Sequence, residues 1–206
     1  ISLLGYASNS IPRGPLEAIG ADIQLKSGDL ALRTNFATLN SLQSLEILVK
    51  RAGRNLTTKE AQALAKTINE KVKLPFKFEF YPTIQHRGVL IIRGGFSENI
   101  TNADPFYGRG VVVPNPSYKL KFSSPMDEED DSKLSSDLVN SFVRQSFQVL
   151  EKHPINLTRA KKGLFAANIV LCREAGNSLT KLKKLKGKWI ALGYMPLEKG
   201  IAKATG

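Results

Sequence analysis

Apolar side chains recur at helical spacing along two long segments of this chain. In residues 57–72 they form a single stripe, and a threonine followed three residues later by a glutamate has the spacing of a capping box. In residues 132–152 the stripe is longer, acids precede it, and Pro154 ends it. These patterns predict two long helices, and a proline near its start predicts a short third helix over residues 14–20.

Strands are predicted by strict alternation or by short apolar runs. Residues 76–80 alternate phenylalanine with polar residues, as a sheet with one covered face requires, and residues 89–92 form a run typical of a buried strand. Further strands are predicted at residues 29–36, 110–113, 118–122, 169–172 and 189–192. Strands interleaved with two long helices predict an α/β fold, with a mixed sheet and helices covering at least one face.

The net charge of +12 over 206 residues favours an anionic partner, which can be nucleic acid, an acidic membrane surface or a phosphorylated metabolite. The densest cationic cluster is a group of five lysines between residues 181 and 188. An acidic block at residues 127–131 would repel a phosphate backbone, and no zinc-ligand spacing, glycine-rich phosphate loop or aromatic-basic RNA-binding motif is present. A basic nucleic-acid-binding module is therefore an alternative that depends on net charge and on the lysines alone.

Two further features limit the class of protein. No apolar run approaches the roughly 20 residues needed to span a bilayer, so no membrane partner is expected. The single cysteine, Cys172, excludes an internal disulfide and lies in an apolar run, where a buried, unreactive thiol is expected. A cytoplasmic protein fits this composition.

Arginines stand in glycine- and asparagine-rich turns, far from the lysine cluster. An arginine offers a rigid fork of donors that matches a carboxylate or a phosphate, whereas lysine is a flexible point charge. Several such forks at turn positions predict a pocket for a small, highly anionic ligand. The arginines concerned are Arg13, Arg33, Arg51, Arg54 and Arg159.

The segments around these arginines also carry a family resemblance. They include Arg13-Gly14-Pro15-Leu16-Glu17, Gly28-Asp29-Leu30-Ala31-Leu32-Arg33, Arg51-Ala52-Gly53-Arg54, His86-Arg87-Gly88, Asp104-Pro105, His153-Pro154-Ile155-Asn156-Leu157-Thr158-Arg159 and Leu197-Glu198-Lys199-Gly200-Ile201. In this order they resemble the archaeal-type, bisphosphoglycerate-independent phosphoglycerate mutases of the alkaline phosphatase-like superfamily. A single tetrapeptide is weak evidence, but this many in the family's order is strong.

The resemblance implies a transferase domain inserted in a phosphatase-like domain. It divides the chain into a linker or phosphatase-domain remnant (1–24), the inserted substrate-binding domain (25–185) and a return linker (186–206). The first and last segments are then expected close together on one side. The nucleophilic serine and the metal ligands of the family have no counterpart here, so the chain is expected to be a fragment that is inactive by itself.

The resemblance also implies an activity, the interconversion of 3-phosphoglycerate and 2-phosphoglycerate through a phosphoserine in glycolysis and gluconeogenesis. Two divalent metal ions, Mn or Mg, would serve the parent enzyme, with ligands outside this chain and no bisphosphoglycerate. The expected partners are phosphoglycerate and the rest of the phosphatase-like domain. Another metal-dependent phosphotransferase or phosphatase of the same superfamily is the alternative, because arginines define an anion but not which one.

Carried over residue by residue, the resemblance assigns substrate binding to Arg13, Arg33, Arg51, Arg54, Arg87, Asn156 and Arg159. It assigns catalytic roles to Lys199 and Asp104. Each residue also has a structural interpretation: an ion pair for the arginines, helix capping for Asn156 and Arg159, plain solvation for Lys199 and loop capping for Asp104. His86 is interpreted as a buried histidine before a strand.

Two departures from the family pattern limit these roles. The acid that usually precedes the arginine turn is absent, because Val49 and Lys50 come before Arg51, and Phe106 replaces a histidine after Asp104-Pro105. One geometric expectation tests the assignment. The side chains of four arginines should converge on one concave face with Lys199 at its rim: Arg33, Arg51, Arg54 and Arg159. If each arginine instead pairs with its own acid, the assignment of the site is wrong.

Overall fold

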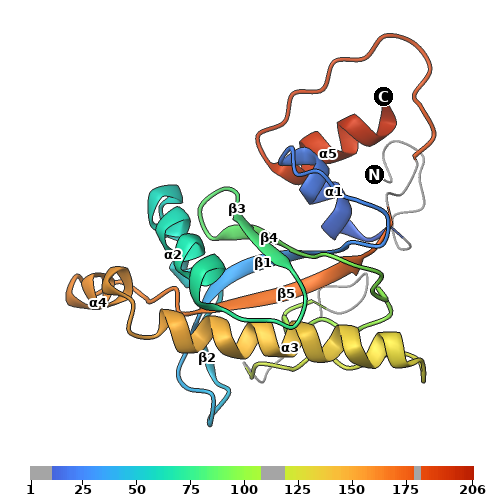
Figure 1. Cartoon of the computed structure of the whole chain (residues 1–206). Helices are drawn as coiled ribbons and strands as arrows, with labels where there is room; N and C mark the ends of the chain where they lie inside the picture. Colours follow the sequence, from blue (N-terminus) through green and yellow to red (C-terminus); the bar gives the residue numbers. More distant parts are fainter. Residues whose placement is uncertain (1–10, 108–118, 179–181) are drawn as a thin grey trace.

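The computed structural model describes residues 11–107, 119–178 and 182–206. Its helices are α1 (Arg13–Gly20), α2 (Thr58–Lys71), α3 (Asp130–Leu150), α4 (Pro154–Lys161) and α5 (Pro196–Thr205), with a 3-10 segment η3 (Lys50–Arg54). Its strands are β1 (Leu30–Leu39), β2 (Ile47–Val49), β3 (Phe78–Pro82), β4 (Arg87–Ile92) and β5 (Ile169–Gly176) (Figure 1).

The sheet has the order β3-β4-β1-β5, and β2 pairs with the end of β1. The α/β class is confirmed, but every pairing among the described strands is antiparallel, where a mixed sheet was expected. The reason lies in the two helical crossovers. The connection through α2 links β1 to β3 across β4, and the connection through α3 links β4 to β5 across β1, so strands of like direction are never neighbours. This is the split βαβ arrangement of ferredoxin-like folds.

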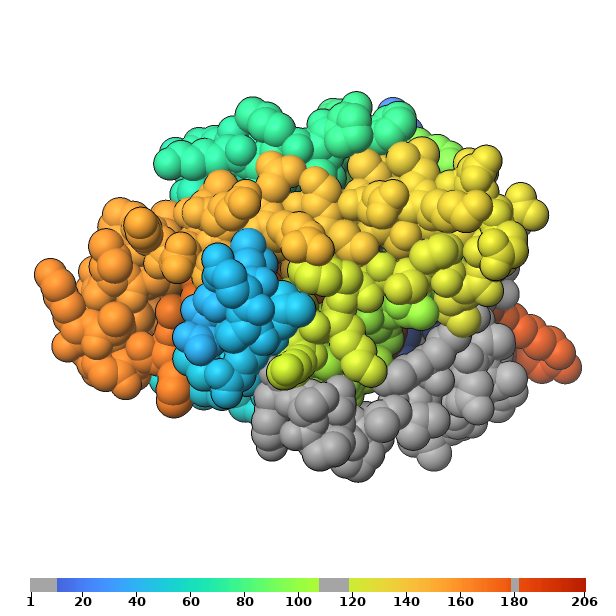
Figure 2. All heavy atoms as spheres, turned by 90° about the horizontal axis from the view of Figure 1, so that it is seen from below, coloured from blue at the N-terminus to red at the C-terminus, as the bar shows by residue number. Residues whose placement is uncertain are grey.

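One face of the sheet is covered by α2 and α3, as expected, and this face holds the main core. Three phenylalanines pack at its centre, with ring centroids 5.7 Å apart for Phe36 and Phe80 and 5.8 Å apart for Phe80 and Phe142. Seen from below, α3 runs across this side, with α2 alongside it and α4 at one end (Figure 2). The opposite face is covered in part by α1, through a small apolar contact of Ala18 with β1 and β4.

The predicted helices are confirmed, since α2 begins with the predicted capping box and α3 and α1 lie where the stripes place them. The predicted strands are less uniform. Of the strand predicted at residues 118–122, the described part, 119–122, contributes an isolated bridge from Lys119 to Glu46, and residues 189–192 form no strand. The predicted strand at 110–113 lies outside the described residues. Cys172 is buried, as expected, and burial raises the pKa of its thiol, which disfavours the reactive thiolate.

The two helices nearest the ends of the chain pack against each other on one side of the sheet (Figure 1). Their backbones touch at two glycines. A Cβ on Gly20 would lie 1.6 Å from the Pro196 carbonyl oxygen, and one on Gly200 would lie 1.7 Å from the Leu16 carbonyl oxygen. The expectation that the first and last segments lie together is met by α1 and α5, while the division into three domain segments stays a prediction. No helix in the described ranges is long and apolar enough to cross a membrane.

Candidate anion-binding site

Strand register gathers three arginines on one face of the sheet. Arg33 of β1 lies opposite Arg173 of β5, and Asn35 of β1 lies opposite Arg87 of β4. Directly opposed residues of antiparallel strands project to the same side, and residues two apart on one strand share a face. These four residues therefore occupy the face that α1 covers only in part. We call this surface the arginine face.

Two further arginines come from η3, where the backbone is unusual. Arg51, Ala52 and Arg54 have φ values of 60°, 43° and 60°, in the left-handed region, and Gly53 between them has φ 71°. Each non-glycine residue in this conformation costs about 1–2 kcal/mol, and such conformations persist where the surrounding structure enforces them, often at functional sites. The turn predicted from its glycine is thus a strained loop that presents Arg51 and Arg54.

Two glutamates neutralise one side of the arginine face. Glu17 of α1 is 2% exposed and accepts a hydrogen bond from Nε of Arg33. A carboxylate oxygen of Glu174 lies 3.3 Å from Arg13 Nε and 3.8 Å from Arg33 Nη1. Arg13 and Arg33 are therefore engaged in ion pairs, which was the structural interpretation of Arg33.

Asp104 forms a buried ion pair with Arg173, a residue that sequence analysis did not single out. Their side chains are 1% and 4% exposed, and Arg173 Nη1 lies 2.9 Å from Asp104 Oδ2. The other carboxylate oxygen accepts a hydrogen bond from the Phe106 amide at 3.1 Å. Because both oxygens are engaged, the geometry favours the loop-capping interpretation of Asp104 over an acid/base role.

Three arginines of this surface, Arg51, Arg54 and Arg87, make no ion pair with any described acid. Burial, together with repulsion from Arg51, Arg33 and Arg54, lowers the pKa of Arg87, while Glu17 opposes that shift. Counting Arg13, Arg33 and Arg173 as well, six arginines face the three carboxylates of Glu17, Glu174 and Asp104. The described part of the surface thus has an excess of three positive charges.

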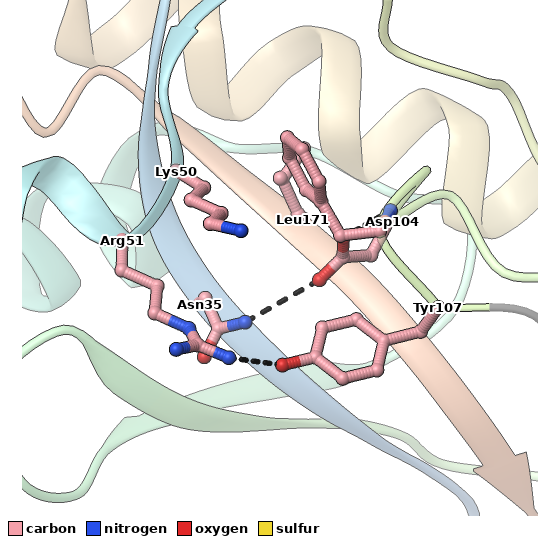
Figure 3. A pocket seen from close by; sticks show the side chains of 7 residues that line it. Asn35, Lys50, Arg51, Asp104, Tyr107 and Leu171 are labelled. Atoms are coloured by element: carbon pink, nitrogen blue, oxygen red, sulfur yellow. Dashed lines mark hydrogen bonds between the residues drawn. The ribbon is translucent and has the colours of Figure 1, made fainter. Parts of the chain in front are cut away.

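A small cavity of about 110 Å³ opens beside this surface (Figure 3). It is lined by Asn35, Lys50, Arg51, Asp104, Phe106, Tyr107 and Leu171. Lys50 Nζ lies 5.0 Å from the centre of the Phe106 ring, and Arg51 donates a hydrogen bond to the Tyr107 hydroxyl. A carboxylate or phosphate group entering the cavity would meet an ammonium, a guanidinium and a phenol, together with the Asp104 carboxylate, whose charge is paired with Arg173.

The predicted convergence of four arginines is wrong at Arg159. This side chain is 2% exposed and donates to the Phe165 carbonyl oxygen at 2.9 Å, to Glu60 Oε1 at 3.0 Å and to Asn55 Oδ1. All three nitrogens of the guanidinium donate to protein acceptors. The Arg159 side chain therefore supports the loop after η3 and has no free pair of donors for a ligand.

Two more predicted site residues lie apart from the arginine face. Asn156 is buried and hydrogen-bonded to the Leu150 and Ala167 backbone at 2.8–3.1 Å, which is a structural role. Lys199 is exposed on α5, and its charge acts on Asp22 at the C-terminal end of α1, whereas Arg13 begins that helix. The predicted position of Lys199 at the rim of the arginine cluster is not observed.

Sequence analysis missed Arg173, Tyr107, Lys50 and the two glutamates. A signal for Arg173 existed, because the predicted strand at 169–172 ends one residue before it, and extending the alternation places it on the same face as Leu171. Glu17 lay inside a quoted motif, but nothing local shows that its side chain reaches Arg33.

Replacing Arg159 by methionine tests its structural role. We expect the free energy of unfolding to fall by about 2–4 kcal/mol, because the buried acceptors around it lose their donor. Urea denaturation of this variant, with the exposed Lys161→Met on the same helix as a control near zero, measures the effect. A variant Arg159→Met that is as stable as the wild type but binds the ligand more weakly would show that Arg159 belongs to the binding site.

His86 is 2% exposed, and neither ring nitrogen has a hydrogen-bond partner in the described residues. Burial, with the charges of Arg87, Arg51, Arg54 and Arg173, lowers its pKa to about 3. The imidazole is therefore neutral at physiological pH and surrounded by positive charge.

This lowered pKa predicts a pH-dependent stability. Between about pH 6.5 and pH 3 the unfolded chain binds a proton at His86 that the folded chain does not, so the free energy of unfolding falls as pH falls. The slope from this group is at most about 1.4 kcal/mol per pH unit. His86→Gln should flatten the dependence measured by urea denaturation at pH 4.5–6.5, with His153 retained in both proteins. Equal slopes would contradict the neutral state of His86.

A sequence profile of the 2,3-bisphosphoglycerate-independent phosphoglycerate mutases matches residues 1–156. The chain belongs to this family. Among named relatives, the phosphoglycerate mutase of Aeropyrum pernix is 37% identical over 224 residues, covering 100% of this chain and 52% of the relative. That of Methanopyrus kandleri is 39% identical over 180 residues, covering 85% and 41%. The resemblance identified from the motifs is confirmed.

Solved structures agree with this membership. The cofactor-independent phosphoglycerate mutase from Thermoplasma acidophilum superposes with a TM-score of 0.67 at 30% identity, over 85% of this chain and 45% of that one. A protein from Pyrococcus horikoshii gives a TM-score of 0.62 at 25% identity, over 100% and 44%. The chain spans about half the length of the phosphoglycerate mutases it matches.

Proposed function

We propose that this chain is the substrate-binding part of an enzyme that interconverts 3-phosphoglycerate and 2-phosphoglycerate in glycolysis and gluconeogenesis. The observation that carries the proposal is the excess of three positive charges on the arginine face. Phosphoglycerate carries one carboxylate charge and a phosphate charge of about −1.5 to −2 near neutral pH, so its charge nearly balances this excess. Family membership makes this ligand the first choice among small anions.

The unpaired arginines hold the ligand in this proposal. Arg51, Arg54 and Arg87 offer guanidinium forks to carboxylate and phosphate oxygens, and charge-assisted hydrogen bonds of this kind contribute about 1.5–3 kcal/mol each. Like charges repel unless an anion lies between them, which supports a site that is completed by its ligand. Arg13, Arg33 and Arg173 are already paired with carboxylates, so in this proposal they shape the surface without adding to its net charge.

The family name implies that bisphosphoglycerate is not required. Two divalent ions, Mn or Mg, are expected in the parent enzyme. The described residues contain no group of three or more histidines, cysteines, aspartates or glutamates that could hold a metal ion, so they do not fit such a centre. The ligands of these ions are therefore assigned to the remainder of the parent protein, and no step at the arginine face is attributed to them.

The remainder of the parent enzyme is also the proposed partner of the α5 region. Four large apolar side chains there are exposed: Trp189 by 64%, Ile190 by 90%, Leu192 by 98% and Tyr194 by 68%. Two of them, Trp189 and Ile190, line a groove of about 560 Å³ along α5. This apolar surface supports residues 186–206, with residues 1–24, as the connection between the inserted domain at 25–185 and a phosphatase-like domain in a cytoplasmic enzyme.

A coupled assay on the full-length protein containing this chain tests the proposal. We expect conversion of 3-phosphoglycerate without added bisphosphoglycerate and loss of activity on treatment with EDTA, restored by Mn or Mg. Activity that is unchanged in the presence of EDTA would contradict the metal requirement. Hydrolysis of other phosphomonoesters without mutase activity would favour the phosphatase or phosphotransferase alternative.

A further inference from the structure

Tyr107 stands at the centre of the contacts that surround the cavity of Figure 3. It follows the Asp104-Pro105-Phe106 segment and is half-buried. Its hydroxyl accepts a hydrogen bond from Nη2 of Arg51, and the Arg173 guanidinium carbon lies 4.3 Å from the centre of its ring. One tyrosine therefore touches two arginines that come from η3 and β5.

The backbone of Tyr107 is held as well. Its carbonyl oxygen accepts a hydrogen bond from Asn102 Nδ2 at 3.0 Å, and Asn102 Oδ1 accepts one from the Glu174 amide at 2.7 Å. Arg173, beneath the ring, is fixed by its buried ion pair with Asp104. The ring thus rests on a rigid part of β5, and its hydroxyl reaches across to the strained η3 loop.

Arg51 depends on this contact for its orientation. It is half-buried, has no ion pair with a described acid, and its one hydrogen bond to a described side chain is the bond to Tyr107. An arginine side chain loses up to about 2 kcal/mol of conformational freedom when it is fixed. When the guanidinium is already fixed, binding of the ligand does not include this loss of conformational entropy.

We propose that Tyr107 is a positioning residue, which fixes the Arg51 guanidinium at the cavity so that it meets the anionic ligand already oriented. The inference deepens the proposed phosphoglycerate-binding function and rests on it for the identity of the ligand. The paired Arg173 serves as the platform for the ring, and the neutral phenol orients Arg51 without cancelling its charge, which a carboxylate in the same place would do.

Tyr107→Phe in the full-length protein separates the hydroxyl from the ring, since phenylalanine still packs on Arg173. We expect KM for 3-phosphoglycerate to rise about 5- to 10-fold, because the ligand then bears part of the cost of ordering Arg51, with kcat changed by roughly twofold or less. Tyr81→Phe, a half-buried tyrosine on β3 beside Glu79 and Arg93, is the matched control and should leave both constants unchanged.

A double-mutant cycle with Arg51→Ala shows whether Tyr107 acts through Arg51. In the Arg51→Ala background, Tyr107→Phe should change KM by less than about twofold, because the group that it positions is gone. An unchanged KM in the single variant, or an equal effect in both backgrounds, would overturn the proposal. The latter result would mean that the hydroxyl contacts the ligand by itself.

A measurement without substrate keeps this inference separate from the proposed function. Nitrogen-15 relaxation of the Arg51 Nε–Hε group should report an ordered side chain in the wild type and a mobile one in Tyr107→Phe. Equal order in the two proteins would refute the positioning role whatever the ligand is. Failure of the wild type to convert 3-phosphoglycerate, with this loss of order intact, would instead contradict only the proposed function.

Discussion

Asp104→Ala is expected to lower the free energy of unfolding by about 3–5 kcal/mol. The substitution leaves Arg173, 4% exposed, without the carboxylate that lies 2.9 Å away, and removing one member of a buried ion pair leaves an uncompensated charge in the interior. The arginine face should be disturbed as well, since Arg173 is the platform of the Tyr107 ring. Urea denaturation monitored by circular dichroism measures the loss.

A matched exposed pair provides the control for this experiment. Lys66 and Glu70 lie 3.9 Å apart on α2 with side chains 78% and 57% exposed, so Glu70→Gln should cost no more than about 0.5 kcal/mol. A loss below about 1 kcal/mol for Asp104→Ala would contradict the structural role. A stably folded Asp104→Asn enzyme with kcat reduced a thousandfold would restore the acid/base interpretation.

The second large effect concerns the unpaired arginines. In the full-length protein, and on the proposed function, Arg51→Ala with Arg54→Ala should lower kcat/KM for 3-phosphoglycerate at least about 100-fold, because each lost guanidinium removes about 1.5–3 kcal/mol of charge-assisted hydrogen bonding. Stability should change little: Arg54 is exposed, and both residues sit in left-handed backbone whose strain alanine neither relieves nor adds to. Steady-state kinetics and thermal unfolding on the same preparations test both halves of this expectation.

Loss of positive charge by itself must be separated from loss of a specific contact. Lys66→Ala removes one exposed charge from α2 and should leave kcat/KM within about twofold. If the double arginine variant bound phosphoglycerate as well as the wild type, the arginine face would not be the ligand site, although membership of the family would stand.

The helices were predictable because their signals are local. The capping box at Thr57 and Glu60 and the stripe behind it lie within one segment, and the structure reproduces both. The strand predicted at 189–192 failed for the opposite reason. A strand needs a neighbouring edge, and none of the described strands pairs with these residues, whose large side chains are exposed.

The candidate site was only partly predictable for the same physical reason. The partners of an arginine are decided by tertiary structure: Glu60 meets Arg159 from 99 residues away, and Asp104 meets Arg173 from 69 residues away. The turn around Gly53 predicted Arg51 and Arg54 as site residues, and the structure shows both in left-handed backbone, while their role in binding stays a prediction. The register of β1 with its neighbours places Arg33, Arg87 and Arg173 on one face, and nothing local in the sequence shows that register.

The central position of β1 has a consequence for how the protein is made. Its pairing with β5 joins residues more than 130 positions apart, such as Ala37 with Ile169, so closing the sheet carries a large entropic cost and comes late in synthesis. Until β5 has left the ribosome, the edge of β1 that pairs with β5 has unpaired backbone groups to which other chains can bind. During this time Arg173 is also missing from the arginine face. A nascent or truncated chain that stops before residue 169 is therefore expected to aggregate and to lack a complete anion site, so that ligand binding reports a finished domain.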